Sequence, residues 1–496
     1  MVADTPVERV IQACAAYQRD VALAQIDMPP GEARAARMAS AVRHGAEVCT
    51  VGELKALQTH IAEASSASQP ILRRLQAWGQ EMHLRGAVLP HQQDIQARQR
   101  SAICIVDEEP ISLRLSFATM AMETRRDRRA AIEDAVGDQL DDMRTLYEAQ
   151  FKALCHTAEG IGYTSLESIW ADILPGDLTA QQDLAVCLLK ETESVYTDLL
   201  TWAVRQRLGV PPGQLRRHDI QALFTFSEYQ QYYQPGVLIA GLQACLGDMD
   251  IDPRADGRIA LRQCPATFGF PAAVSVQIPN EVVVTYSQVS GPKAAEAYAG
   301  AFGRALLWAY TSPALPLATR LLGETALPIS NAQLLAEMVA SPSWLHHYLQ
   351  ITVDGNYWPW RRLDRLYRLR RQLGRFLFTQ QLSGMKSLAG AQEAYREIMM
   401  EACQVDYASA YYLVDWDWSY TSLAILRGWS LTYLLLETVR RQFGDDWFRT
   451  PDSGAWLRNY WHSAIRENVE ELQQQFADTP WDAALLAEVL VNEEIW

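Results

Sequence analysis

The chain has 496 residues, a formal net charge of −15 at pH 7 and 49% hydrophobic residues. This length allows two or three domain-sized units around a large buried core, and the hydrophobic fraction is ordinary for a globular protein. The acidic balance lacks the basic surface that nucleic-acid binding needs, so we expect no nucleic-acid partner. The eight cysteines include no Cys-x-x-Cys pair, which favours reduced thiols over a disulfide framework or a zinc knuckle.

No targeting or membrane-spanning segment is predicted. Charged residues interrupt the first 20 positions, so no apolar signal-peptide core is present. The most apolar stretch begins at Ser422, but it contains Arg427 and ends at Glu437, which is typical of a buried core helix rather than a membrane span. We therefore expect a cytoplasmic protein without a membrane span.

Helical periodicity dominates the chain. Apolar residues recur three and four positions apart over 5–25, 31–64 and 68–85, and 91–155 has the pattern of a continuing helical array. Residues 361–377 predict an arginine-rich amphipathic helix. Such a helix could bind an acidic partner or a membrane surface, but in an acidic protein pairing with internal carboxylates is the favoured interpretation.

One segment, about 257–287, has β character. It contains RIALR, AVSVQI and EVVVTY, which are short, rich in β-branched residues and separated by turn-forming residues. These runs predict a small sheet within an otherwise helical protein. The sheet either caps the helical core or offers an edge strand, AVSVQI or EVVVTY, for backbone pairing with an extended peptide.

Residues 291–313 have the layout of a zinc-peptidase helix without its zinc chemistry. A His-Glu-x-x-His helix places two imidazoles on one face, one turn apart, with a general-base glutamate beside the first. The corresponding positions here are Gly300, Ala301 and Arg304, within Gly-Ala-Phe-Gly-Arg-Ala-Leu. The small and aromatic frame is present, whereas both histidines and the glutamate are missing.

The segment from Cys264 to Glu324 resembles the thimet oligopeptidase and oligoendopeptidase family of zinc peptidases. The resemblance continues through a second helix, expected to run from Ser330 to Leu349, and through the segment that follows Tyr420. It is good over about 250–496 and weak before that. In the family the second helix supplies a glutamate ligand; Ser330 matches that position, and Glu337 matches a following acidic position.

The resemblance implies a mainly α, two-lobed fold with a deep central cleft. Residues 1–250 would form one helical lobe, and residues 251–496 a metallopeptidase-like helical domain with the small sheet. The family's sheet holds an extended peptide beside the active-site helix, and its C-terminal region supplies a tyrosine or histidine that polarises the scissile carbonyl. Tyr420 is the nearest match to that tyrosine, although a packed aromatic core also explains the aromatic residues around it.

The chemistry of a zinc peptidase is missing at all four matched positions. Glycine has no donor atom, arginine is cationic, and a serine hydroxyl is a poor zinc ligand, while Ala301 cannot accept a proton. We therefore expect neither a metal nor another cofactor. Arg304 is expected to pair with Glu337 and so fill the empty metal site. The residues predicted to contact a bound peptide are Arg304, Trp308, Glu337 and Tyr420.

Three functional hypotheses remain open. The first is a catalytically inactive peptidase homologue that binds a peptide or a partner protein in the former substrate cleft. The second is a zinc-dependent oligopeptidase with non-standard ligands, although no two histidines have ligand spacing. The third is a helical structural subunit of a complex. No nucleophile elbow, phosphate-binding loop or dinucleotide-binding motif supports another enzyme class.

Overall fold

The computed structural model describes residues 5–225, 229, 232–477 and 482–491. It is mainly helical, as the sequence predicts, and contains two small sheets, of which the sequence predicts one. The first part of the chain contains α1 (Pro6–Asp27), α2 (Glu32–Val48), α3 (Val51–Glu63), α4 (Gln69–Ser101), β1 (Ile103–Val106), β2 (Glu109–Ser112), α5 (Leu113–Met122), α6 (Arg126–Asp142), α7 (Arg144–Gly160), α8 (Leu166–Ile173), α9 (Leu178–Glu191), α10 (Glu193–Arg207), α11 (Arg217–Leu223) and α12 (Pro235–Asp248). The rest contains β3 (Ile259–Gln263), β4 (Ala272–Gln277), β5 (Glu281–Tyr286), α13 (Pro292–Tyr310), α14 (Leu317–Leu321), α15 (Ala326–Ala340), α16 (Pro342–Leu349), α17 (Tyr357–Gly384), α18 (Ala391–Cys403), α19 (Tyr412–Asp415), α20 (Thr421–Phe443), α21 (Pro451–Ala464), α22 (Val469–Phe476) and α23 (Ala483–Val491).

Two boundaries correct the sequence prediction. The expected helix over 31–64 is broken at Cys49, and Thr50 caps the next helix by accepting a hydrogen bond from the backbone of Glu53. The expected helix from Ser330 to Leu349 is also two helices. Ser341 caps α16 and Pro342 occupies its first turn, and this sequence starts a new helix because proline has no backbone N–H to continue the old one.

The array expected over 91–155 also contains a hairpin that the periodicity did not reveal. Strands β1 and β2 pair antiparallel. Asp107 and Glu108 connect them with positive φ angles of 52° and 66°, as the tight turn of a two-residue hairpin requires. The β-branched residues of β1, among them Ile105, which is 62% exposed, were the sequence signal for this strand.

The second sheet is the one predicted near the centre of the chain. Its order is β3-β5-β4, with β5 parallel to β3 and antiparallel to β4. Because β5 lies between two partners, EVVVTY cannot be an edge strand, and that part of the prediction is wrong. AVSVQI, in β4, does lie at an edge. The sheet packs against α13 on one side, and Val274 and Val283 contact α1 through Ala22 and Ile26 on the other.

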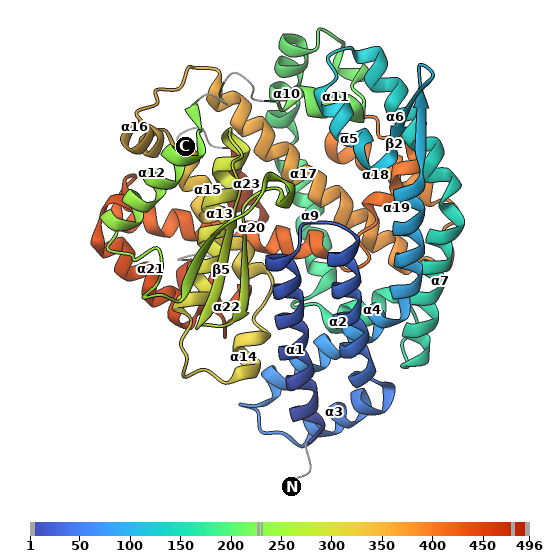
Figure 1. The fold of residues 1–496 in the computed structure, drawn as a ribbon, viewed down its shortest axis with the longest axis vertical. Coiled ribbons are helices and arrows are strands. Elements are labelled where there is room, and N and C mark those ends of the chain that lie inside the picture. The colour runs from blue at the N-terminus through green and yellow to red at the C-terminus, as the bar shows by residue number, and fades with distance from the viewer. Residues whose placement is uncertain (1–4, 226–228, 230–231, 478–481, 492–496) are drawn as a thin grey trace.

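The helices that position the candidate site lie near the centre of the molecule. In Figure 1, α13 and α15 lie behind the sheet, while α17 and α20 run beside them. Helix α20 contains the apolar stretch from Ser422 and most of its residues are buried, as expected for a core helix. None of the helices in the described part of the chain is long and apolar enough to cross a membrane.

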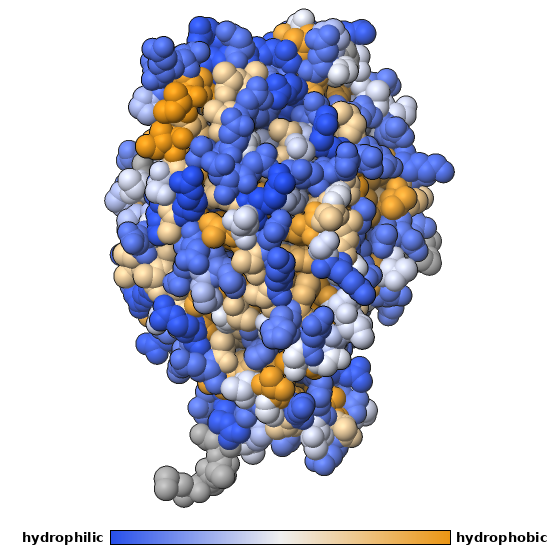
Figure 2. Space-filling view, turned by 90° about the vertical axis from the view of Figure 1, so that its right-hand side faces the viewer, coloured by the Kyte–Doolittle hydropathy of each residue, from blue (hydrophilic) through white to orange (hydrophobic). Residues whose placement is uncertain are grey.

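One face of the molecule, which carries α4, α6 and α7, is covered mainly by hydrophilic side chains, with smaller hydrophobic patches between them (Figure 2). Most of the buried apolar residues form one continuous core that runs from α4 to α23.

Candidate functional site

The candidate site is built on the contact between α13 and α15, which pack closely side by side. Two glycines allow this approach. A Cβ atom on Gly303 would lie 2.1 Å from the carbonyl oxygen of Asn331, and one on Gly300 would lie 3.4 Å from that of Ala332. The two helices expected to be neighbours are therefore neighbours, and backbone packing accounts for the glycines at positions 300 and 303.

The four positions matched to metal chemistry contain no group that could bind a catalytic metal. Gly300 and Ala301 are buried in helix packing. The Ser330 hydroxyl lies 3.3 Å from the hydroxyl of Thr432 on α20, so it is engaged away from α13. Among the described residues, no three His, Cys, Asp or Glu side chains converge in a way that could hold a metal ion.

Arg304 is half-buried on α13 and has no hydrogen bond or ion pair within the described part of the chain. It follows Gly303 by one residue, so it lies about 100° around the helix from the row that contacts α15. Trp308, four residues later, is half-buried on the same face. Burial lowers the pKa of Arg304 from its usual value, and no carboxylate counteracts this effect.

The expected pair between Arg304 and Glu337 is not formed. Glu337 instead accepts a hydrogen bond from Arg365 on α17, with 2.9 Å between Nη2 and Oε2, and both side chains are buried. Gln333 donates to the other carboxylate oxygen at 2.7 Å. Arg365 can reach Glu337 because α17 lies next to α20 and α20 next to α15, a tertiary arrangement that sequence spacing does not reveal.

A second, largely buried carboxylate, Glu296, is paired in the same way one turn before Gly300. It contacts Arg361, and it accepts a hydrogen bond from Arg368 at 2.9 Å. Burial alone would raise the pKa of Glu296, but the two guanidinium groups outweigh it and lower the pKa to about 2. We call Glu296, Glu337, Arg361, Arg365 and Arg368 the ion-pair cluster. It confirms that the arginine-rich helix pairs with internal carboxylates.

Tyr420 does not belong to this site. Its ring packs against Trp170 and Phe376, and its hydroxyl donates to Gln380 at 3.0 Å. Among the described residues, none of these contacts reaches α13 or α15. Tyr433, one of the aromatic residues further along α20, is the tyrosine beside Glu337, with 3.5 Å between its hydroxyl and the carboxylate. The sequence contained this residue, but nothing in its spacing distinguished it from its aromatic neighbours.

The chain has the fold of metallopeptidases, as comparison with solved structures shows. Pyrococcus furiosus carboxypeptidase matches with a TM-score of 0.60 and 13% identity, over 99% of both chains. The M32 carboxypeptidase from Deinococcus radiodurans R1 matches with a TM-score of 0.59 and 14% identity, over 98% of this chain and 97% of its own. A protein assigned as an oligoendopeptidase F from Bacillus anthracis matches with a TM-score of 0.59 and 13% identity, over 97% and 94%.

These similarities extend over nearly the whole chain, so they include the N-terminal half, where the sequence resemblance is weak. No protein-family model and no curated protein sequence matches the chain. At such low identity the structural matches establish the fold alone. The catalytic metal that this fold suggests does not fit the residues present at the α13–α15 contact. Glycine, a guanidinium and a serine hydroxyl engaged with Thr432 stand at the three positions that the sequence resemblance matches to ligands, and no group of metal-binding side chains converges among the described residues.

Proposed function

We propose that this protein is a catalytically inactive metallopeptidase homologue that binds a peptide or a partner protein beside α13. The proposal rests above all on Arg304. Its half-buried guanidinium has no partner among the described residues, and the sequence resemblance matches this position to the second metal ligand. Such a group repels a metal cation and attracts a carboxylate, with which it can form two parallel hydrogen bonds.

The surroundings of Arg304 support this role. Trp308 on the same face offers an apolar surface next to the charge, a combination that suits a peptide side chain beside a carboxylate. Strand β4 packs against α13 and is an end strand of its sheet. In this proposal an extended segment of the ligand pairs with the outer backbone edge of β4. Glu337 is not expected to contact the ligand, since Arg365 and Gln333 already satisfy its carboxylate.

Metal analysis and a cleavage assay on the full chain test the loss of hydrolysis. We expect less than one tenth of an equivalent of zinc, and no cleavage of a mixed peptide library with or without added zinc. One equivalent of bound zinc together with chelator-sensitive cleavage would favour the oligopeptidase with non-standard ligands instead.

Binding is tested with a peptide library that has free C-terminal carboxylates and the same library with C-terminal amides. Enrichment should depend on the carboxylate, and Arg304→Met should weaken binding of the selected peptides at least tenfold. Arg19→Met is the matched control, because Arg19 is an exposed arginine on α1. Equal binding by the Arg304 and Arg19 variants would refute the assigned role of Arg304.

A helical structural subunit is the second candidate. The ion-pair cluster occupies the space between α13, α15 and α17. Apolar side chains are exposed on α5, where Leu115 is 60% and Met122 is 80% exposed. If the peptide libraries show no binding at all, while Leu115→Lys abolishes a stable complex isolated from cells, this second candidate is the correct one.

A further inference from the structure

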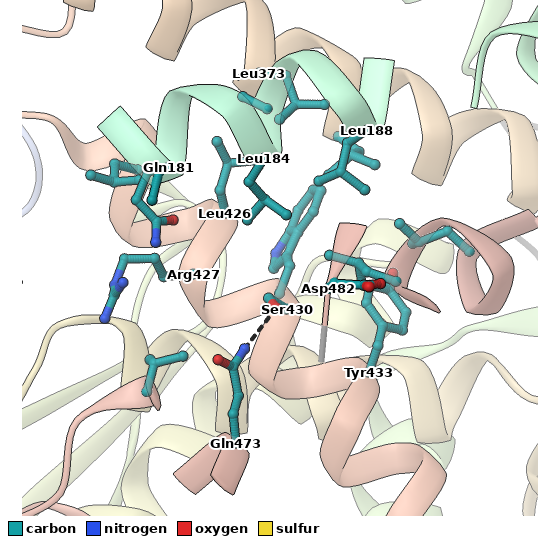
Figure 3. Close-up of a pocket in the computed structure, with 18 of the residues that line it drawn as sticks. Gln181, Leu184, Leu188, Leu373, Leu426, Arg427, Ser430, Tyr433, Gln473 and Asp482 are labelled. Atoms are coloured by element: carbon teal, nitrogen blue, oxygen red, sulfur yellow. Dashed lines mark hydrogen bonds between the residues drawn. The ribbon is translucent and has the colours of Figure 1, made fainter. Parts of the chain in front are cut away.

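A cavity of about 200 Å³ lies between α9, α17, α20, α22 and α23, apart from Arg304 and its face of α13 (Figure 3). Most of its wall is aliphatic. Leu184 and Leu188 come from α9, Leu373 from α17, and Leu423 and Leu426 from α20. A cavity of about 150 Å³ with such a lining stays dry and accepts benzene, so this one is large enough for an aromatic ring or a branched alkyl group.

One end of the cavity is polar. Gln181 on α9 and Gln473 on α22 both extend to this end, near Ser430 and Arg427 (Figure 3). The Gln473 amide nitrogen donates to the Ser430 hydroxyl at 3.1 Å. The carboxamide oxygen of Gln473 and the whole carboxamide of Gln181 have no hydrogen-bond partner within the described residues. They can therefore donate to and accept from a ligand.

The charge at this end is already compensated. Arg427 donates to Glu324 at 2.7 Å and to both oxygens of Glu470 at 2.6 and 2.8 Å. Its positive charge is thus compensated by two carboxylates and does not call for an anion. Asp482 adds an exposed carboxylate to the lining. An anionic head at the polar end would meet the Glu470 carboxylate and, among the described lining residues, no cation other than the compensated Arg427, so its desolvation would not be repaid.

We propose that this cavity binds a small uncharged molecule with an apolar body of one aromatic ring or branched alkyl group and an amide or alcohol head. The apolar body lies among the leucines, and the head exchanges hydrogen bonds with the Gln181 and Gln473 carboxamides. The volume is below the 300 Å³ or so of common drug-sized pockets, so the occupant is smaller than a peptide segment. The inference does not depend on the loss of hydrolysis or on Arg304.

Three probes of similar size separate the contributions to binding. These are 3-phenylpropionamide, 3-phenylpropionate and propylbenzene, titrated into the full chain by calorimetry with a parallel thermal-unfolding measurement. We expect the amide to bind at least tenfold more tightly than the carboxylate and to raise the unfolding temperature. Absence of binding by the amide, or tighter binding of the carboxylate, would overturn the proposal.

Two variants locate the binding. Leu184→Trp should fill the cavity and abolish amide binding, whereas Val186→Trp, on the solvent-exposed side of α9 where Val186 is 52% exposed, should leave it unchanged. Gln473→Leu should weaken the amide at least fivefold without weakening propylbenzene. Should Leu184→Trp fail to fold, the Gln473→Leu result decides alone: equal loss for both probes, or no loss for either, contradicts the assigned polar end.

Discussion

Arg365 and Glu337 form a buried ion pair between α17 and α15, with 2.9 Å between Nη2 and Oε2. This pair occupies the carboxylate for which Arg304 was the expected partner. As a result Arg304, on α13, keeps a charge that no described residue neutralises. The same helix, α17, also neutralises Glu296 through Arg361 and Arg368. A single arginine-rich helix therefore compensates both Glu296 on α13 and Glu337 on α15, whereas Arg304 has no carboxylate partner among the described residues.

Removing one member of the buried pair should be costly. Glu337→Ala leaves Arg365 charged and buried without its carboxylate, and breaking a buried pair in this way costs about 3–5 kcal/mol. Urea unfolding should show a loss of this size. The double variant Glu337→Met with Arg365→Met removes both charges and should recover most of the loss. A single-variant loss below about 1 kcal/mol would mean that the pair contributes little.

The pH dependence of stability should identify Glu296. Its pKa is lowered to about 2 in the folded state, below the usual 4.5, so the folded protein favours the ionised form. The resulting stability is fully present above about pH 5 and is lost as the pH falls from there through about 2. The destabilisation caused by Glu296→Gln should therefore be greatest at pH 7 and should shrink at pH 3.

Glu281→Gln, at an exposed position on β5, is the control, and it should change the free energy of unfolding little at either pH. A penalty for Glu296→Gln that stays constant with pH would contradict the lowered pKa.

The sequence was sufficient for the helical fold and the central small sheet, which follow from periodicity, and for the contact between α13 and α15, which follows from the family resemblance. It was not sufficient for the partners of the charged residues. Glu337 lies 28 residues before Arg365, and Glu296 lies 65 residues before Arg361. Only the packing of α17 brings them together, so family analogy led to Arg304 instead. The sequence also did not show that Tyr433 rather than Tyr420 lies beside Glu337, because several aromatic residues in one segment cannot be told apart without the direction of their helix.

Neutralising Arg304 should cost nothing in stability. Its guanidinium is partly desolvated and has no partner among the described residues, whereas the methylene stem packs in the protein. Arg304→Met keeps the stem and removes the charge, so we expect the free energy of unfolding to stay equal or to increase by up to about 1 kcal/mol. Arg361→Met is the contrasting variant, because it leaves Glu296 with one partner fewer, and it should lose stability in the same urea assay. A large loss from Arg304→Met would show that Arg304 has a structural partner after all and would weaken its proposed role in binding.

Gly300 and Gly303 on α13 should differ sharply when each receives a methyl group. A Cβ on Gly303 would lie 2.1 Å from the backbone oxygen of Asn331, a separation that neither helix can relieve without moving its backbone, so Gly303→Ala should force α13 and α15 apart. Overpacking of this kind costs about 1–3 kcal/mol or more.

On Gly300 the nearest atom would be 3.4 Å away, which the Ala332 backbone can accommodate, and alanine is favoured over glycine inside a helix by about 1 kcal/mol. Gly300→Ala should therefore be neutral or stabilising by urea unfolding. Equal effects of the two substitutions would mean that α13 and α15 do not approach each other through Gly303, and the neighbouring placement of the motif helix and α15 would have to be abandoned.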